Sequence, residues 1–493
     1  MTQADSPIHV RRASAAYVLI GVGCVALAVF LIVRWFSLIN QYAVNTPVWD
    51  DFDFYFLLAS HPGRWAKIGD HPSLWTLFDW QWGPHRMGIG LIASKFLLKA
   101  THWNIRAEAF FIGVLVTIAT GVALLLKWRL FGGLAWYDIL IPLLMLTPSQ
   151  YDIWASTPDS SHGAFPLLFV FLSALAWTAQ RWRIRYPWVL LLCFLATFTG
   201  FGFFLAPATA VLLLLHLVYS CVKKQRQPAI VSAVSLGVVG CMIALYFVGY
   251  KFNPSNFGFQ FPYPQYGLYP YYMAMALSRA VGLVGPYLGS SHLAGLESIG
   301  GVFVASAVGW LLLAAMIATI IWRLGPSTSA TPADRGRSNV ILLLVLYCLM
   351  FDCSMVIGRI NLGLFAIQAS RYVPLIMPGL IGLYFAALCI ERRFWRRALV
   401  GIMVLLACYS GLSIKRNDHY WMNWEERGKL IWVRTYLASG DLRLAGEVTD
   451  SEEPTFSIYP NNHGDHLNLK LQFLRQHKFS FFGDPPPAWQ KSE

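Results

Sequence analysis

An apolar stretch near the N-terminus decides the fold class. Residues 15–35 read AAYVLIGVGCVALAVFLIVRW and follow a basic pair, Arg11 and Arg12. A helix that crosses the hydrocarbon core of a bilayer needs about 20 mostly apolar residues. The stretch therefore predicts a transmembrane helix with positive charge on its cytoplasmic side. The apolar run continues well past residue 28, so we interpret it as an uncleaved anchor rather than a secretory signal.

Similar apolar runs follow along the whole chain. They occupy residues 107–126, 134–147, 163–180, 188–199, 201–221, 229–250, 299–322, 339–357, 372–390 and 398–412. Together they predict about eleven spanning helices. The composition agrees, since 56% of the 493 residues are hydrophobic and only 13% are charged, against about 25% charged in soluble domains. We expect an all-α polytopic membrane protein, and we exclude a disordered chain, a coiled coil and an ordinary cytosolic enzyme.

The basic residues predict the topology. The net charge of +13 comes from short clusters of lysine and arginine in every second connection between apolar runs, so we expect no nucleic-acid partner. By the positive-inside rule these connections are cytoplasmic. The N-terminus is then cytoplasmic and the C-terminus extracytoplasmic, in the inner (plasma) membrane. Residues 87–100 are apolar but short and carry two lysines, so they predict an interfacial helix on the outer leaflet.

The predicted outer face carries most of the polar side chains. A transmembrane module over residues 1–412 has a first outer loop at 37–106 and an aromatic outer loop at 251–297. Residues 413–493 form a small extracytoplasmic lobe in this topology, which either caps the bundle or binds an acceptor. We therefore expect the functional site to lie on the outer face of the membrane.

Three carboxylates follow the first apolar run. Asp50, Asp51 and Asp53 lie among aromatic residues where the first helix is expected to leave the membrane. Carboxylates at an apolar boundary can have a raised pKa, which suits a general base. The same oxygens suit a divalent cation such as Mg²⁺ or Mn²⁺, for which Asp50 and Asp51 are the candidate ligands. The alternative is a solvated helix end without a chemical role.

Basic side chains occur at two further membrane boundaries. His85 and Arg86 follow a Gly-Pro pair, and Arg359 and Arg371 bracket a short apolar connection. A guanidinium is permanently charged and donates two parallel hydrogen bonds to a phosphate, so these positions suit a lipid phosphate. The alternative is that the side chains only anchor the chain among lipid headgroups.

Four short motifs resemble those of the GT-C class of membrane glycosyltransferases, which use polyprenyl-phosphate-linked sugars. Trp-Asp-Asp-Phe at 49–52 resembles the acidic motif in the first outer loop of that class. Gly-Pro-His-Arg at 83–86 resembles a Glu-His-Arg motif of bacterial members, with Pro84 in place of the glutamate. Thr-Pro-Ser-Gln-Tyr-Asp at 147–152 resembles the short second outer loop, and Ser-Arg-Tyr at 370–372 resembles a late motif that opens a span.

The resemblance implies a GT-C-like fold and a sugar transfer on the outer face. In such enzymes an acceptor hydroxyl attacks the anomeric carbon of the sugar and polyprenyl phosphate leaves. The implied candidates for the base are, in order, Asp51, Asp50 and Asp53. The leaving phosphate needs positive charge placed around it. The implied phosphate ligands are Arg371 and Arg359, assisted by His85 and Arg86. The implied acceptor is an envelope glycan or a lipid-linked molecule, and membrane lipids surround the bundle.

Two other functions fit the same topology. One is a transporter or flippase for a lipid-linked sugar, which would depend on polar residues inside the spans. Asp352 is the main ionisable residue of that kind, and an acid at such depth is a functional candidate by default. The other is an O-antigen-type ligase or polymerase, which would depend on outer arginine and histidine residues rather than on the aspartates.

Overall fold

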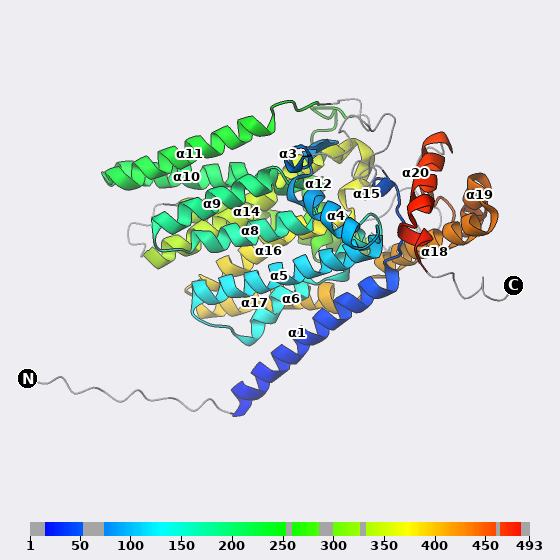
Figure 1. The fold of residues 1–493 in the computed structure, drawn as a ribbon. Coiled ribbons are helices and arrows are strands. Elements are labelled where there is room, and N and C mark those ends of the chain that lie inside the picture. The colour runs from blue at the N-terminus through cyan, green and yellow to red at the C-terminus, as the bar shows by residue number, and fades with distance from the viewer. Residues whose placement is uncertain are drawn as a thin grey trace, which may run out of the picture.

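The fold is a bundle of long helices with a smaller helical lobe at one end (Figure 1). The computed structural model describes residues 15–52, 73–252, 259–284, 299–325, 332–459 and 464–484. The long bundle helices are α1 (Ala15–Tyr42), α5 (Ile105–Phe131), α10 (Leu205–Val222), α11 (Arg226–Tyr246), α13 (Ile299–Leu324), α14 (Pro332–Arg359), α16 (Val373–Leu388) and α17 (Arg393–Leu412). Within the described ranges, eight helices are long and apolar enough to cross a membrane. The all-α membrane class is thereby confirmed.

Shorter elements connect these helices. On the N-terminal side they are α3 (Leu74–Phe78), β1 (Gln81–Trp82), β2 (His85–Arg86), α4 (Gly88–Ala100), η2 (Trp136–Ile139), α6 (Leu140–Met145), η3 (Pro148–Gln150), α7 (Asp152–Ala155), α8 (Ala164–Trp177), α9 (Trp182–Thr197) and η4 (Gly200–Phe204). Further along they are α12 (Leu268–Ala280), η6 (Ile360–Leu362), α15 (Gly363–Ile367) and η7 (Ser370–Tyr372). The lobe consists of α18 (Arg416–Ser439), α19 (Leu442–Glu452), α20 (Gly464–His477) and η8 (Ser480–Phe482).

Three of the expected spans are not among the eight described helices that are long and apolar enough to cross a membrane. The run at 163–180 forms α8, and most of the run at 188–199 belongs to α9, which begins at Trp182 and ends at Thr197. The run at 134–147 divides into the 3₁₀ turn η2 and the short helix α6. Asp138 explains the division, because its carboxylate accepts the backbone N–H of Ala135 and so stabilises the turn before the helix. Whether these pieces also cross the membrane stays a prediction.

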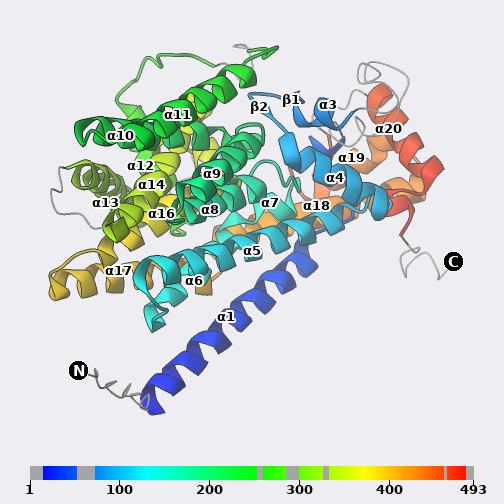
Figure 2. The same cartoon turned by 60° about the vertical axis from the view of Figure 1, so that its left-hand side comes forward.

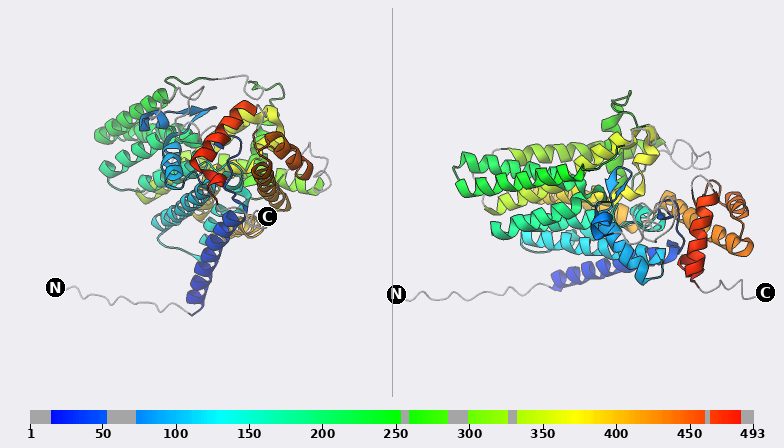
Figure 3. Two further views of the ribbon diagram at one scale, coloured as in Figure 1. Left: turned by 45° about the vertical axis from the view of Figure 1, so that its right-hand side comes forward. Right: turned by 45° about the horizontal axis from the view of Figure 1, so that its top comes forward.

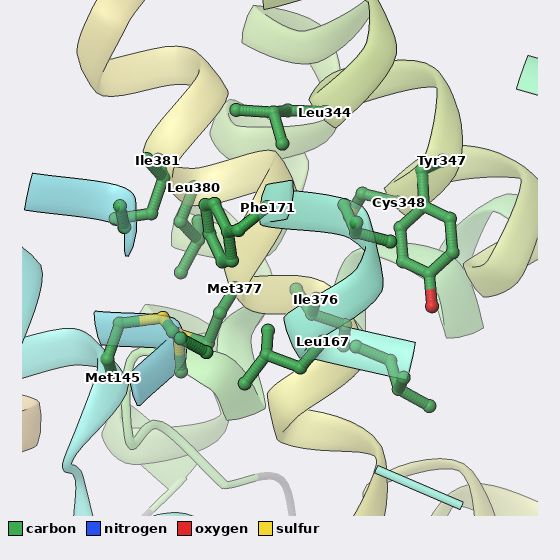
Figure 4. Close-up of a cluster of buried hydrophobic side chains, with 14 of the residues drawn as sticks. Met145, Leu167, Phe171, Leu344, Tyr347, Cys348, Ile376, Met377, Leu380 and Ile381 are labelled. Carbon is green, nitrogen blue, oxygen red and sulfur yellow. The ribbon is translucent and has the colours of Figure 1, made fainter. Parts of the chain in front are cut away.

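Helix α16 lies at the centre of the bundle. It is apolar on all sides, as expected for a helix enclosed by other helices, and its residues from Val373 to Ala387 are buried. Figure 4 shows part of this core, where side chains of α6, α8, α14 and α16 meet. Gly379 permits close packing against α14, since a Cβ there would lie 2.5 Å from the sulfur of Cys348.

Helix α1 has a different environment. Its C-terminal end packs against α5, while its N-terminal half diverges from the bundle (Figure 2). Only 11% of its most apolar window is buried inside the protein. Leu19, Val25 and Phe30 are exposed on it. In a bilayer this surface would be covered by lipid.

Segments expected on the outer face contact one another at the end of the bundle that carries the lobe (Figure 3). The N–H of Trp49 donates to the carbonyl of Ile458 at 3.0 Å, and Arg279 pairs with Asp418 at 2.7 Å. We call this end the lobe end.

Segments expected in the cytoplasm contact one another at the opposite end. Arg337 donates to the carbonyl of Leu130 at 2.8 Å, and Lys127 pairs with Asp138 at 2.7 Å. The alternation of basic clusters thus separates the connections of the chain correctly into two groups. Which group faces the cytoplasm stays a prediction.

Candidate functional site

A cavity of about 920 Å³ lies at the lobe end of the bundle. Its wall comes from the β1–β2 hairpin, η4, the segment at the end of α11 and the last turns of α14. Much of the wall is aromatic, with Trp75, Phe203, Tyr246, Phe247 and Phe252 among its side chains. Such a wall packs well against a hydrocarbon chain or against the face of a sugar ring.

Part of the cavity wall is polar and basic. His85, Arg359 and Tyr372 contribute to it. Burial lowers the pKa of His85 well below its ordinary value, and the positive charges of His162, Arg359 and Arg371 lower it further. His85 is therefore neutral at neutral pH and offers one donor and one acceptor nitrogen. The charge that could attract an anion comes from its neighbours.

A carboxylate–imidazole pair lies beside His85. Nδ1 of His162 is 2.8 Å from Oδ2 of Asp159, and the two histidine rings are 4.9 Å apart at right angles. Burial alone would raise the pKa of Asp159, but His162 and the hydrogen bonds from Ser161 outweigh it and hold this pKa below its ordinary value. Asp159 is therefore an ionised carboxylate that holds the His162 ring.

Arg86 is engaged inside the protein. Its Nε and Nη2 donate to the carbonyl of Tyr246 at 2.9 and 2.7 Å, and Nη2 also reaches the carbonyl of Val248. Its Nη1 pairs with Asp79 at 2.7 Å. These carbonyls belong to the C-terminal end of α11, where a cation is favourable. Every nitrogen of the guanidinium has a protein partner, so Arg86 fixes the β1–β2 hairpin to α11.

Arg371 interacts with two carboxylates. Its Nη1 is 3.8 Å from Oδ2 of Asp152, and the charge of Asp50 also acts on it. Ser370 completes the connection, because its hydroxyl accepts the backbone N–H of Asp152 at 2.9 Å. The second outer segment and the Ser-Arg-Tyr motif, which the sequence places far apart, therefore meet at this point.

Asp51 is fully buried. The N–H of Val48 donates to its Oδ2 at 3.0 Å, and within the described part of the chain Oδ1 has no hydrogen-bond partner. Burial raises the pKa of Asp51 well above its ordinary value. The Val48 N–H and the ammonium of Lys429 oppose the shift, while Glu108 and Asp50 add to it. Asp51 is thus a carboxylate that takes up a proton readily.

The lobe contributes a buried ion pair to this site. Lys429 on α18 donates to the carbonyls of Ala155 and Ser156 at 2.5 and 2.6 Å, and its Nζ is 3.9 Å from Glu425. Glu425 in turn accepts the hydroxyl of Ser156 at 2.8 Å. Lys429 also acts electrostatically on both Asp51 and Asp152. The lobe therefore holds α7 in place and does more than cover the bundle.

Most of the residues predicted from the sequence come together. His85 and Arg359 line one cavity, and the charges of Arg359 and Arg371 both act on His85. Asp50 is exposed, and its negative charge acts on both Asp51 and Arg371. Arg86 also lines the cavity, but its guanidinium is bonded to the end of α11. Asp53 lies outside the described residues.

Sequence reasoning missed four members of the cluster: Asp152, Asp159, His162 and Lys429. Asp152 is the last residue of the Thr-Pro-Ser-Gln-Tyr-Asp motif at 147–152. The sequence therefore indicates its position in an outer connection but not its role. Asp159 and His162 carry a weak signal, a carboxylate and an imidazole three residues apart in a predicted outer connection. Lys429 gives no signal, since its burial depends on how α18 packs against α7.

The described residues hold no group of three or more histidine, cysteine, aspartate and glutamate side chains that could bind a metal ion. Asp50 and Asp51 alone are neighbours, and two carboxylates leave most of the coordination of Mg²⁺ or Mn²⁺ to water or substrate. The possibility of a divalent cation at these two residues stays a prediction.

Comparison of the chain with known protein families, with curated proteins and with solved structures returned no match.

Proposed function

We propose that the protein is a membrane glycosyltransferase. It transfers a sugar from a polyprenyl-phosphate donor to an envelope glycan or a lipid-linked acceptor on the outer face of the membrane. The residues that carry the reaction are Asp51 and Asp50 on one side, and Arg359, Arg371 and His85 on the other.

The observation that carries this proposal is the combination of two environments in one cavity. Its aromatic wall suits a long apolar chain, and its basic part near Arg359 suits a phosphate. A polyprenyl phosphate has both parts in one molecule. Asp50 lies near Arg371, so a sugar on the phosphate would be close to the acidic residues.

The arrangement assigns each group a task. The hydroxyl oxygen of the acceptor forms a bond to the anomeric carbon, and the bond from that carbon to the phosphate oxygen breaks. Asp51 takes the hydroxyl proton, for which a raised pKa is favourable. The electron pair of the broken bond stays on the phosphate, where Arg359 and Arg371 stabilise the negative charge.

Mass spectrometry of envelope glycans tests the proposal in cells. A deletion strain is compared with strains that carry the wild-type protein or the Asp50→Asn/Asp51→Asn variant at equal membrane abundance. We expect the deletion to remove a specific sugar mass and only the wild type to restore it. Asp334→Asn is the matched control, because Asp334 pairs with Arg337 at the opposite end of the bundle. Full restoration by the double variant would contradict the proposal.

The ligase alternative has one observation in its favour. His85 has one more basic neighbour than the sequence indicates, because His162 acts on it together with Arg359 and Arg371. A ligase predicts that Arg371→Gln abolishes the glycan while the double aspartate variant retains it. The glycosyltransferase proposal predicts that both variants abolish it.

The transporter alternative depends on Asp352. This residue is fully buried in α14, and within the described ranges neither of its carboxylate oxygens has a hydrogen-bond partner. A transporter predicts that Asp352→Asn abolishes the glycan while the double aspartate variant retains it. The glycosyltransferase proposal predicts instead that the double aspartate variant lowers the amount of glycan more than Asp352→Asn does.

A further inference from the structure

The pair formed by Asp159 and His162 has no task in the reaction described above. We propose that His162, held by Asp159, is a further ligand for the phosphate of the lipid-linked donor. This inference rests on the proposed function and adds to it a binding residue, His162, and a positioning residue, Asp159.

The pair is held by an ion-pair contact and a hydrogen bond. Oδ2 of Asp159 lies 2.8 Å from Nδ1 of His162, and Oδ1 of Asp159 accepts the backbone N–H of Ser161 at 2.7 Å. A carboxylate beside Nδ1 fixes the plane of an imidazole and stabilises the imidazolium form, which donates a second hydrogen bond from Nε2 to an anion.

The turn that carries the pair is packed tightly between α4 and η4. The hydroxyl of Ser161 donates to the carbonyl of Met87 at 2.9 Å. A Cβ on Gly90 would lie 2.0 Å from the hydroxyl oxygen of Ser161, and a Cβ on Gly200 would lie 2.0 Å from its carbonyl oxygen. Two glycines thus allow the backbones to approach closely. A rigid turn of this kind places a side chain precisely, as a binding site requires.

The position of the ring connects it to the cavity. His162 contacts His85 and Phe201, with ring centroids 4.9 and 5.8 Å away, and both of these residues line the cavity. The charges of His162, Arg359 and Arg371 all act on the single ring of His85. Basic groups from the second outer segment, α14 and η7 therefore converge on one place.

Lipid binding by the full-length protein in nanodiscs tests the inference. The probes are a polyprenyl phosphate and the uncharged polyprenol of the same chain length. His162→Asn keeps a donor near Asp159 but removes the Nε2 end of the ring. We expect it to weaken binding of the polyprenyl phosphate by about tenfold to a hundredfold, the usual effect of a lost hydrogen bond to a charged group. Binding of the polyprenol should stay within about twofold of wild type.

Two further variants make the test specific. Asp159→Asn has nearly the same shape, and we expect it to weaken only the phosphate-bearing lipid and to raise the KM for the donor more than it lowers kcat. His216→Asn is the control, because His216 bonds to Asn339 at the opposite end of the bundle. It should change neither affinity.

The outcomes separate this inference from the proposed function. Unchanged affinity for the polyprenyl phosphate in both site variants would overturn the inference alone, as would an equal loss for both lipids, which indicates a purely structural pair. Failure of the wild type to prefer the polyprenyl phosphate over the polyprenol would overturn the proposed function as well.

Discussion

Asp51 is the residue on which the proposed chemistry depends most. Its carboxylate is buried, the charges of Glu108 and Asp50 act on it, and Lys429 provides an opposing positive charge. Burial and the neighbouring acids favour the neutral form, whereas Lys429 favours the ionised form. The balance raises the pKa, so Asp51 is a stronger base than an exposed aspartate.

The rate of transfer should therefore depend on pH through Asp51. A base must be ionised, so activity is lost as the pH falls through the raised pKa of Asp51. The acid limb of the kcat/KM profile should lie above the ordinary aspartate value of about 3.9. Asp51→Asn should lower the rate about 10²- to 10⁴-fold, while Asp334→Asn keeps the profile of the wild type. An acid limb unchanged by Asp51→Asn would contradict the assignment.

At the residue scale, sequence motifs predicted the acidic and basic candidates but not their partners. His85 and Arg359 line the cavity, and Arg371 acts electrostatically on His85, but their role as phosphate ligands stays a prediction. No sequence pattern distinguishes these arginines from Arg86, whose donors are used within the protein. That distinction depends on where the C-terminal carbonyls of α11 lie. Lys429 could not be predicted from the sequence either, because only tertiary packing brings it close enough to act on Asp51.

The β1–β2 hairpin depends on Arg86 for its position on α11. Arg86→Met removes its bonds to the carbonyls of Tyr246 and Val248, and the pair with Asp79. We expect a loss of about 3 kcal/mol in the free energy of unfolding, because buried carbonyls are left without donors. Arg359→Met should stay within about 0.5 kcal/mol but weaken polyprenyl-phosphate binding. Thermal unfolding of the purified protein, followed with lipid binding, measures both. Equal destabilisation by Arg86→Met and Arg359→Met would contradict a structural role for Arg86 and a binding role for Arg359.

Helix α4 should tolerate no side chain at Gly90. A Cβ there would lie 2.6 Å from the backbone N and Cα of Ser161, which cannot rotate away. Gly90→Ala should lower the free energy of unfolding by about 1–3 kcal/mol and displace the turn that carries His162. Gly121→Ala on α5 is the control, because nothing lies within 4 Å of its Cβ. It should be neutral or stabilise the helix by up to about 1 kcal/mol. Equal unfolding midpoints for Gly90→Ala and Gly121→Ala would contradict the close contact between Gly90 and Ser161.

At the element scale, the sequence predicted the existence of the helices better than their lengths. The run at 134–147 is apolar throughout, so hydropathy cannot reveal that Asp138 divides it into a turn and a short helix. The interfacial segment was predicted at 87–100 and forms a helix at Gly88–Ala100. Local pattern was sufficient there, because the segment is short and bounded by Gly88 and Thr101.

At the scale of the whole molecule, the alternation of basic clusters predicted which connections meet at each end of the bundle. The contact of Trp49 with Ile458 joins the first loop to the lobe, and the contact of Lys127 with Asp138 lies at the other end. The role of the lobe could not be predicted. Its helix α18 is too polar to be recognised as part of a membrane site, and only the fold brings Lys429 to α7.

The orientation of the protein can be measured directly. By the positive-inside rule, a fluorescent protein fused to the N-terminus should fold in the cytoplasm and fluoresce. An alkaline phosphatase fused to the C-terminus should be active outside the membrane. The reversed fusions serve as controls and should be inactive. Activity of the reversed pair instead would place the site in the cytoplasm and exclude an outer-face transfer.

Transfer in a purified system tests the central claim most directly. The full-length protein in nanodiscs is incubated with a set of polyprenyl-phosphate sugars and extracted acceptor glycans, and free polyprenyl phosphate is measured by mass spectrometry. The account predicts that the wild type releases polyprenyl phosphate from at least one donor and adds the sugar mass to the acceptor. Asp51→Asn should bind the same donor without releasing it. Release from no donor, or equal release by Asp51→Asn, would contradict the account.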